Sequence, residues 1–216
     1  MEHLRAIELF AGAGGLGIGI SRAGFKPLKV VEYNEDCRTT LALNREKANG
    51  PIYDWPEAID RDVRHQKYSA YEGKVALISG GPPCQPFSLG GRHNAQADAR
   101  DMFPEAVRAV REARPKAFLF ENVKGLTRES FAAYFEYIRL QLSHPHLVAR
   151  CDEDWSDHLR RLQKHHTSHR ESSDDYRLVV QVMNAADYGV PQQRHRVFFV
   201  GLRADLGKEY AFPPPT

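Results

Sequence analysis

The residues best suited to chemistry lie in a proline-rich loop, residues 80–88, with the sequence GGPPCQPFS. Its prolines fix φ and remove amide donors, so the chain around Cys84 is stiff. The loop follows an apolar run typical of a buried strand, and open α/β sheets bind ligands at the carboxyl ends of their strands. A rigid, exposed thiol there could act as a nucleophile if its thiolate is stabilised. The alternative role, a small buried hydrophobe, fits Cys37 and Cys151 better than Cys84.

A glycine-rich turn, residues 12–17 with the sequence GAGGLG, is the second candidate. It fits the pattern G-x-G-x-x-G, in which glycines allow a tight turn and let a ligand approach the backbone closely. Glu32 follows 20 residues after Gly12, where a carboxylate can accept hydrogen bonds from ribose hydroxyls. NAD, FAD and S-adenosylmethionine all fit this arrangement. A turn that serves only the packing of a strand on a helix is the alternative.

Three further residues could complete a nucleotide site. Tyr33, beside Glu32, could stack on an adenine ring, because an aromatic face offers apolar area at low conformational cost. Asp62 could accept a hydrogen bond from the adenine amino group, and Val63 could cover the ring. Taken singly, an exposed aspartate and a core tyrosine explain these residues equally well.

The elements that must position these residues follow from the apolar pattern. Expected strands cover residues 4–10, 29–33, 75–79, 117–121, 177–183 and 196–202. Expected helices cover residues 15–23, a segment capped by Asn34 or Asp36 that runs to about Lys47, and 101–113. Strands that alternate with helices predict an α/β fold with a doubly wound, mostly parallel sheet.

The composition is that of a globular protein: of 216 residues, 42% are hydrophobic and 27% charged, with a net charge of +2. This excludes collagen-like, disordered and disulfide-scaffold proteins. No apolar run approaches the roughly 18 residues of a membrane span, and the N-terminus lacks the order of a signal peptide. Three cysteines without a CxxC pair argue against disulfides and a zinc ribbon, so a cytoplasmic location is expected.

One segment, residues 141–175, differs from the rest, because it holds six of the ten histidines. We expect a polar helix and loop inserted into a single domain that covers residues 1–216. A metal site could use His165, His166, His169 and Cys151, but only His165 and His169 have helical spacing. A solvated basic helix that could contact phosphates is the favoured interpretation, with no bound metal.

Four segments resemble the signature blocks of the DNA cytosine-5 methyltransferases, in the order found in that family. They are residues 10–15 (FAGAGG), 82–88 (PPCQPFS), 121–123 (ENV) and 184–196 (NAADYGVPQQRHR). With the strands between them, they cover nearly the whole chain except residues 141–175. The resemblance implies a Rossmann-like, S-adenosylmethionine-dependent methyltransferase fold and methyl transfer to carbon 5 of cytosine in duplex DNA.

The same resemblance implies roles for single residues. Cys84 adds as a thiolate to carbon 6 of the base, and Glu121 holds or protonates ring nitrogen 3. Asn122 fixes the cysteine loop, while Arg196 and Arg194 hold the base carbonyl or a neighbouring phosphate. From the residues alone, Glu121 could be a surface ion-pair carboxylate and the arginines a solvated basic turn. The cofactor would contact Phe10, Gly12, Gly14, Gly15, Glu32, Tyr33, Asp62, Val63 and Pro83.

The resemblance also concerns partners. The family flips its target base out of the duplex and fills the gap with a recognition region, which normally follows the last of these blocks together with two further blocks. Residues 212–216 resemble the segment just before that region. We therefore expect either a second protein chain that supplies the remainder or a truncated copy. An RNA methyltransferase, an inactive cofactor- or DNA-binding subunit and a nicotinamide-dependent oxidoreductase remain alternatives.

Overall fold

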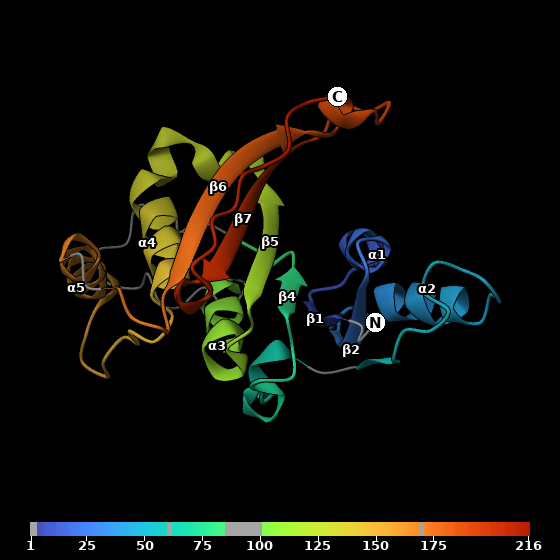
Figure 1. The fold of residues 1–216 in the computed structure, drawn as a ribbon, viewed down its shortest axis with the longest axis horizontal. Coiled ribbons are helices and arrows are strands. Elements are labelled where there is room, and N and C mark those ends of the chain that lie inside the picture. The colour runs from blue at the N-terminus through green and yellow to red at the C-terminus, as the bar shows by residue number, and fades with distance from the viewer. Residues whose placement is uncertain (1–3, 60–61, 85–100, 169–170) are drawn as a thin grey trace.

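A seven-stranded mixed sheet forms the centre of the computed structural model, which describes residues 4–59, 62–84, 101–168 and 171–216 (Figure 1). The strand order is β3-β2-β1-β4-β5-β7-β6. The first five strands in this order are parallel, whereas β7 runs antiparallel to both β5 and β6. The strands are β1 (Leu4–Leu9), β2 (Phe25–Val31), β3 (Ala58–Ile59), β4 (Leu77–Gly80), β5 (Ala117–Val123), β6 (Tyr176–Asn184) and β7 (His195–Arg203).

Helices cover both faces of the sheet, which confirms the doubly wound α/β fold (Figure 1). Successive strand residues point to opposite faces, so Val30 and Val31 of β2 belong to two different cores. The smaller core lies under α1 and α2 and includes Leu41 and Trp55. The larger core lies under α3 and α4. The helices are α1 (Gly15–Arg22), α2 (Glu35–Arg45), α3 (Phe103–Ala113), α4 (Ala132–Ser143) and α5 (Trp155–Thr167).

The expected elements are present, with corrected bounds. The Asn34 side chain accepts a hydrogen bond from the Cys37 amide, so Asn34, and not Asp36, caps α2. The second strand begins at Phe25, four residues before the expected start, and ends at Val31, so Glu32 directly follows it. β3 and α4 were not expected. α4 is apolar on more than one side because it packs against both β6 and α5, which weakens its amphipathic pattern.

The expected insert is more firmly packed than a solvated helix. α5 contacts α4 and buries His158 and Leu162. The His158 ring forms hydrogen bonds with the Tyr137 hydroxyl, at 2.8 Å, and with the Leu147 carbonyl, at 2.7 Å. Cys151 is exposed.

The C-terminal residues 207–216 follow the last strand without regular structure. They contact the loop between β6 and β7, because the Thr216 amide donates to the Asp187 carbonyl and the Tyr188 hydroxyl donates to the Pro213 carbonyl. Among the helices of the described residues, none has both the length and the apolar character that a membrane crossing requires.

Candidate functional site

The glycine turn joins β1 to α1 through three residues with positive φ: Phe10 at 52°, Gly12 at 54° and Gly14 at 91°. A positive φ is unusual for an aromatic residue, and such strain is typical of functional sites. A Cβ atom on Gly14 would lie 3.0 Å from Cδ2 of Leu41. On Gly17, a Cβ atom would overlap the Trp55 ring. Part of the motif thus serves close packing, although against α2 and the loop that carries Trp55 and not against a strand.

Glu32 connects this turn to the end of β2. One carboxylate oxygen accepts the Gly12 amide at 2.7 Å, and the other accepts the Asn34 amide at 2.7 Å. The residue is only 9% exposed. Because a carboxylate oxygen can accept more than one hydrogen bond, Glu32 is held in place while it keeps acceptor capacity for a ligand.

A cavity of about 440 Å³ lies at the carboxyl ends of β1 and β2. Its lining includes six of the residues expected at a cofactor site: Phe10, Glu32, Tyr33, Asp62, Val63 and Pro83. Gly12, Gly14 and Gly15 are not part of that lining. Sequence reasoning did not assign five further lining residues to the site: Val31, Asn34, Arg64, Gly81 and Met102. The Met102 amide donates to the Pro83 carbonyl at 2.9 Å, a contact that local sequence does not reveal.

Two lining residues of opposite charge form an ion pair. Arg64 donates to Asp62 from its backbone amide at 2.9 Å and from Nε at 2.8 Å. The side-chain hydrogen bond from Arg64 holds the pKa of Asp62 below its usual value. Asp62 is therefore an ionised acceptor at neutral pH. Tyr33, in contrast, is 74% exposed and leaves its ring available to a ligand.

Cys84 directly follows Pro83 but is half-buried, so the expectation of an exposed thiol was wrong. The thiol packs against the larger core, and Sγ lies 3.9 Å from the Tyr134 hydroxyl. Burial raises the pKa of Cys84 to about 11 because a thiolate loses solvation there, although the contact with Tyr134 lowers it in part. The remainder of the expected motif, residues 85–88, lies outside the described residues.

At the carboxyl end of β5, Glu121 pairs with Arg196 at the start of the neighbouring strand β7 and with Arg194 just before that strand. Nε of Arg196 lies 2.7 Å from Oε1 of Glu121, and an Nη atom of Arg194 lies 3.9 Å from the same oxygen. The antiparallel register, which pairs Val123 with Arg196, explains this contact. Glu121 and Arg196 are each about a quarter exposed, whereas half of the Arg194 side chain is exposed.

Asn122 joins this group to the cysteine loop. Its Nδ2 donates to the Pro82 carbonyl at 2.8 Å, and the residue is 7% exposed. β4 and β5 are neighbours, with Gly80 opposite Phe120. The structure therefore brings the start of the cysteine loop, Glu121 and Arg196 to one edge of the sheet.

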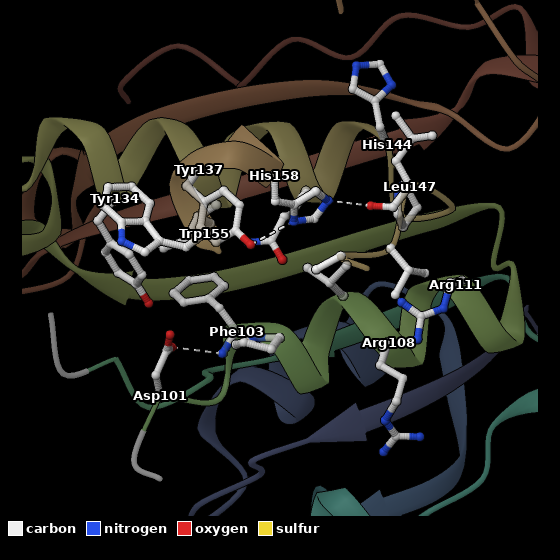
Figure 2. A pocket seen from close by; sticks show the side chains of 17 residues that line it. Asp101, Phe103, Arg108, Arg111, Tyr134, Tyr137, His144, Leu147, Trp155 and His158 are labelled. Carbon is white, nitrogen blue, oxygen red and sulfur yellow. Dashed lines mark hydrogen bonds between the residues drawn. The ribbon is translucent and has the colours of Figure 1, made fainter. Parts of the chain in front are cut away.

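A second cavity, of about 390 Å³, lies between α3, α4 and the segment that leads into α5 (Figure 2). Tyr134 and Asp101 line one end of it, and His144 and Arg111 also contribute to its wall. Burial raises the pKa of Tyr134, so its hydroxyl stays protonated. Through Tyr134 this cavity borders the buried side of Cys84, and the sequence pattern did not predict it.

Comparison with known proteins assigns the family. Residues 4–144 and 156–215 match the C-5 cytosine-specific DNA methylases. The chain belongs to this family. The methylase match leaves out only residues 145–155 within the segment that had been expected as an insert. It also favours methyl transfer over the nicotinamide-dependent alternative.

Individual methylases are similar along nearly the whole chain. The Type II methyltransferase M.AquIA of Picosynechococcus is 37% identical over 98% of this chain and 76% of that protein. M.NgoMIV of Neisseria gonorrhoeae is 34% identical over 98% of this chain and 55% of that protein. An E. coli prophage protein titled as a DNA modification methyltransferase superposes with a TM-score of 0.64 at 27% identity, over 96% of this chain and 49% of that one. The chain thus spans about half the length of several methylases it matches.

Proposed function

We propose that this methylase chain binds S-adenosylmethionine in the 440 Å³ cavity and methylates carbon 5 of cytosine in duplex DNA. One observation carries the proposal. Pro83 lines the cavity, and the next residue is the cysteine whose loop is tied by Asn122 to the Glu121–Arg196 pair. A methyl donor in the cavity would therefore adjoin the thiol and the carboxylate that this reaction requires.

The cavity suits the chemical groups of this cofactor. Glu32 offers fixed carboxylate oxygens for a ribose diol, and Asp62 offers an ionised acceptor for an amino group. Val63 and Phe10 supply apolar wall, and the exposed Tyr33 ring can stack on a purine. Because Arg64 pairs with Asp62, the lining keeps the net negative charge of Glu32, which favours a ligand that carries a sulfonium cation.

The residues at the sheet edge supply covalent and acid–base chemistry. The Cys84 thiol loses its proton to water, and the thiolate forms a bond to carbon 6 of cytosine while an electron pair moves into the ring toward carbon 5 and nitrogen 3. Glu121 holds nitrogen 3 as charge develops there, while Arg196 fixes the carboxylate. When bound, S-adenosylmethionine supplies the methyl group from its sulfonium. The carbon-5 proton then passes to water, the bond between sulfur and carbon 6 breaks, and the aromatic base is restored.

We propose that a target recognition region, in the same polypeptide or in a second protein chain, contributes to DNA binding. The target base must leave the stack, at a cost of a few kcal/mol, and that cost is recovered by contacts with the duplex. Longer methylases such as M.NgoMIV have additional length available for such contacts. Arg194, half exposed beside the Glu121–Arg196 pair, is suited to a phosphate.

The test is transfer of a labelled methyl group from S-adenosylmethionine to mixed-sequence duplex DNA. We expect Cys84→Ala to abolish labelling and to leave the cofactor dissociation constant unchanged. Cys151→Ala is the matched control, because Cys151 is exposed and distant in sequence, and it should label DNA normally. Labelling that persists in Cys84→Ala would contradict the covalent mechanism. A wild-type chain that binds no S-adenosylmethionine would contradict the assignment of the cavity.

A further inference from the structure

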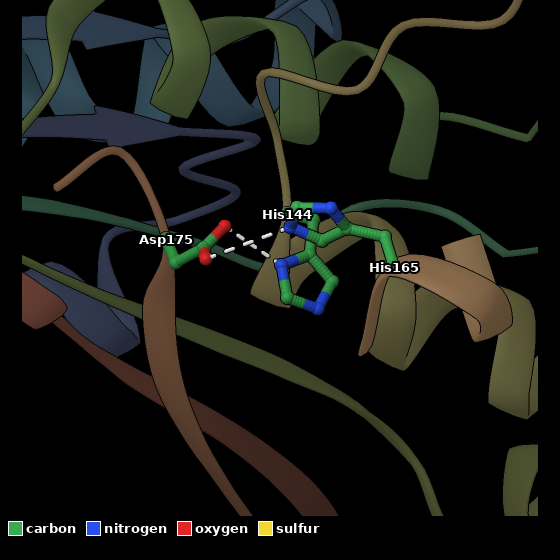
Figure 3. A group of neighbouring side chains, drawn as sticks. All are labelled: His144, His165 and Asp175. Atoms are coloured by element: carbon green, nitrogen blue, oxygen red, sulfur yellow. Dashed lines mark hydrogen bonds and ion pairs between the residues drawn. The ribbon is translucent and has the colours of Figure 1, made fainter. Parts of the chain in front are cut away.

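Four histidines and an aspartate gather where three elements meet, far from the cysteine loop in sequence. His144 follows α4, His146 lies in the next loop, His165 and His166 belong to α5, and Asp175 immediately precedes β6. Asp175 is 3% exposed and His144 is 7% exposed. Figure 3 shows the rings of His144 and His165 turned toward the Asp175 carboxylate.

The distances between these side chains are close to those around a metal ion. Nδ1 of His144 and Nδ1 of His146 lie 2.7 Å and 3.4 Å from Oδ1 of Asp175. Nε2 of His165 lies 3.8 Å from Oδ2. Zinc binds nitrogen and oxygen at about 2.0–2.2 Å, which places the corners of its tetrahedron roughly 3.3–3.5 Å apart. Ligand atoms of His144, His165 and Asp175 lie within 4.8 Å of one another, and His146 is the fourth candidate because its Nδ1 faces the same carboxylate. Side-chain shifts, largest for His146, would bring all four groups onto one ion.

Two of these ring nitrogens have no hydrogen-bond partner among the described residues. Nδ1 of His146 and Nε2 of His165 are buried and make no hydrogen bond within the described ranges. An unsatisfied buried polar atom destabilises the folded state, so it requires an explanation. A cation beside Asp175 would accept a lone pair from each ring.

The surroundings of His144 match those of a metal ligand. Its other ring nitrogen, Nε2, lies 3.0 Å from Nδ1 of His166. Metal-binding histidines donate the second ring N–H to an acceptor, most often a carboxylate, a backbone carbonyl or water, which fixes the tautomer and the orientation of the ring. Here Nδ1 of His166 is the acceptor. With the proton on Nε2, the lone pair of Nδ1 points toward Asp175.

We propose that His144, His146, His165 and Asp175 bind one zinc ion. In the bound state the His144 ring carries its proton on Nε2, so the ion replaces the hydrogen bond between Nδ1 of His144 and Asp175. Four protein ligands leave no open position, which is typical of a structural site. The ion would join α4, its following loop and α5 to the start of β6. The expectation of no metal rested on a different set that included Cys151, which is exposed, and His169, which lies outside the described residues.

The test is zinc binding by the full chain after treatment with a chelator, followed by competition against a chromophoric chelator. We expect one zinc ion per chain, and at least about a 100-fold weaker affinity in His146→Gln and in His165→Gln. These two side chains are about a quarter exposed, so their replacement is more easily tolerated than that of His144 or Asp175. Circular dichroism of each variant confirms that it folds.

Two controls separate this site from others. His65→Gln, at an exposed position in another part of the chain, and Cys151→Ala should both retain wild-type affinity. X-ray absorption should show nitrogen and oxygen ligands without the sulfur shell near 2.3 Å. A chain that binds no zinc at micromolar concentration would overturn the proposal. So would variants at 146 and 165 that bind zinc as tightly as the wild type.

Discussion

Two regions at the carboxyl ends of the strands differ: the cofactor cavity beside β1 and β2 already has its binding geometry, whereas the Cys84 region beside β4 and β5 does not have a reactive thiolate. On the β1–β2 side, Glu32 is fixed by two backbone amides, and a cavity lies beside it. On the β4–β5 side, the Cys84 thiol is half-buried and its pKa is raised to about 11. The cofactor side is thus preformed, whereas the nucleophile is held as a neutral thiol. This difference suggests that the thiolate forms only when substrate changes its surroundings.

After the loss of Cys84 itself, the largest expected effect concerns Arg196 and Arg194 on the nucleophile side. Arg196→Met removes the guanidinium that lies 2.7 Å from Glu121, and we expect methyl transfer to fall by about 10²–10³-fold. Arg194→Met is the matched control, since its 3.9 Å contact and half-exposed side chain predict a loss of less than about tenfold. Single-turnover rates at saturating cofactor measure both. Equal losses in the two variants would remove the distinction between them.

Glu8 tests whether burial in this sheet raises acid pKa values as it does for Cys84. Glu8 is 3% exposed and accepts a hydrogen bond from Ser79, and burial raises its pKa to about 7 from 4.5. The folded state then binds more protons than the unfolded state between these values, so stability falls as pH rises from 4.5 to 7. The shift corresponds to roughly 3 kcal/mol. Glu8→Gln should abolish this part of the pH dependence.

Urea unfolding of wild type and Glu8→Gln at pH 4.5, 6 and 8 measures this effect. The two proteins should differ most at pH 8, where the variant should be the more stable. If the free energy of unfolding changed with pH by the same amount in wild type and in Glu8→Gln, Glu8 would not be the cause of the pH dependence.

The smallest expected effect concerns the cofactor side. Glu32→Ala removes an acceptor that is fixed by two amides, and we expect the S-adenosylmethionine dissociation constant to rise by about 10- to 100-fold. Glu35→Ala, an exposed position in the first turn of α2, should change it less than twofold. Isothermal titration calorimetry distinguishes them. An unchanged constant in Glu32→Ala would remove this residue from the site.

The sequence alone was enough to predict a functional residue where short, continuous segments of the chain position it. The spacing from Gly12 to Glu32 placed a carboxylate beside the glycine turn, and the hydrogen bond between them confirms that proximity. The start of β2 was misplaced because Pro27 argues against a strand. The structure accommodates Pro27 opposite Ala6, beside an irregularity in the β1–β2 register.

What sequence could not supply depends on contacts between distant segments. The antiparallel direction of β7 brings Arg196 to Glu121, and the apolar pattern of a strand does not predict its direction. The burial of Cys84 depends on Tyr134, 50 residues away. His144, His165 and Asp175 lie at or beside three different elements, α4, α5 and β6, so no local spacing predicts their convergence.

The most direct test of this contrast is the pH dependence of Cys84 alkylation in a chain with Cys37→Ala and Cys151→Ala, which leaves one cysteine. Without DNA, the rate of reaction with iodoacetamide should rise with a midpoint near pH 11. Saturating S-adenosylmethionine should bind this same chain normally. A midpoint at or below the ordinary thiol value of about 8.5 would contradict the account, because the nucleophile would then be as prepared as the cofactor site.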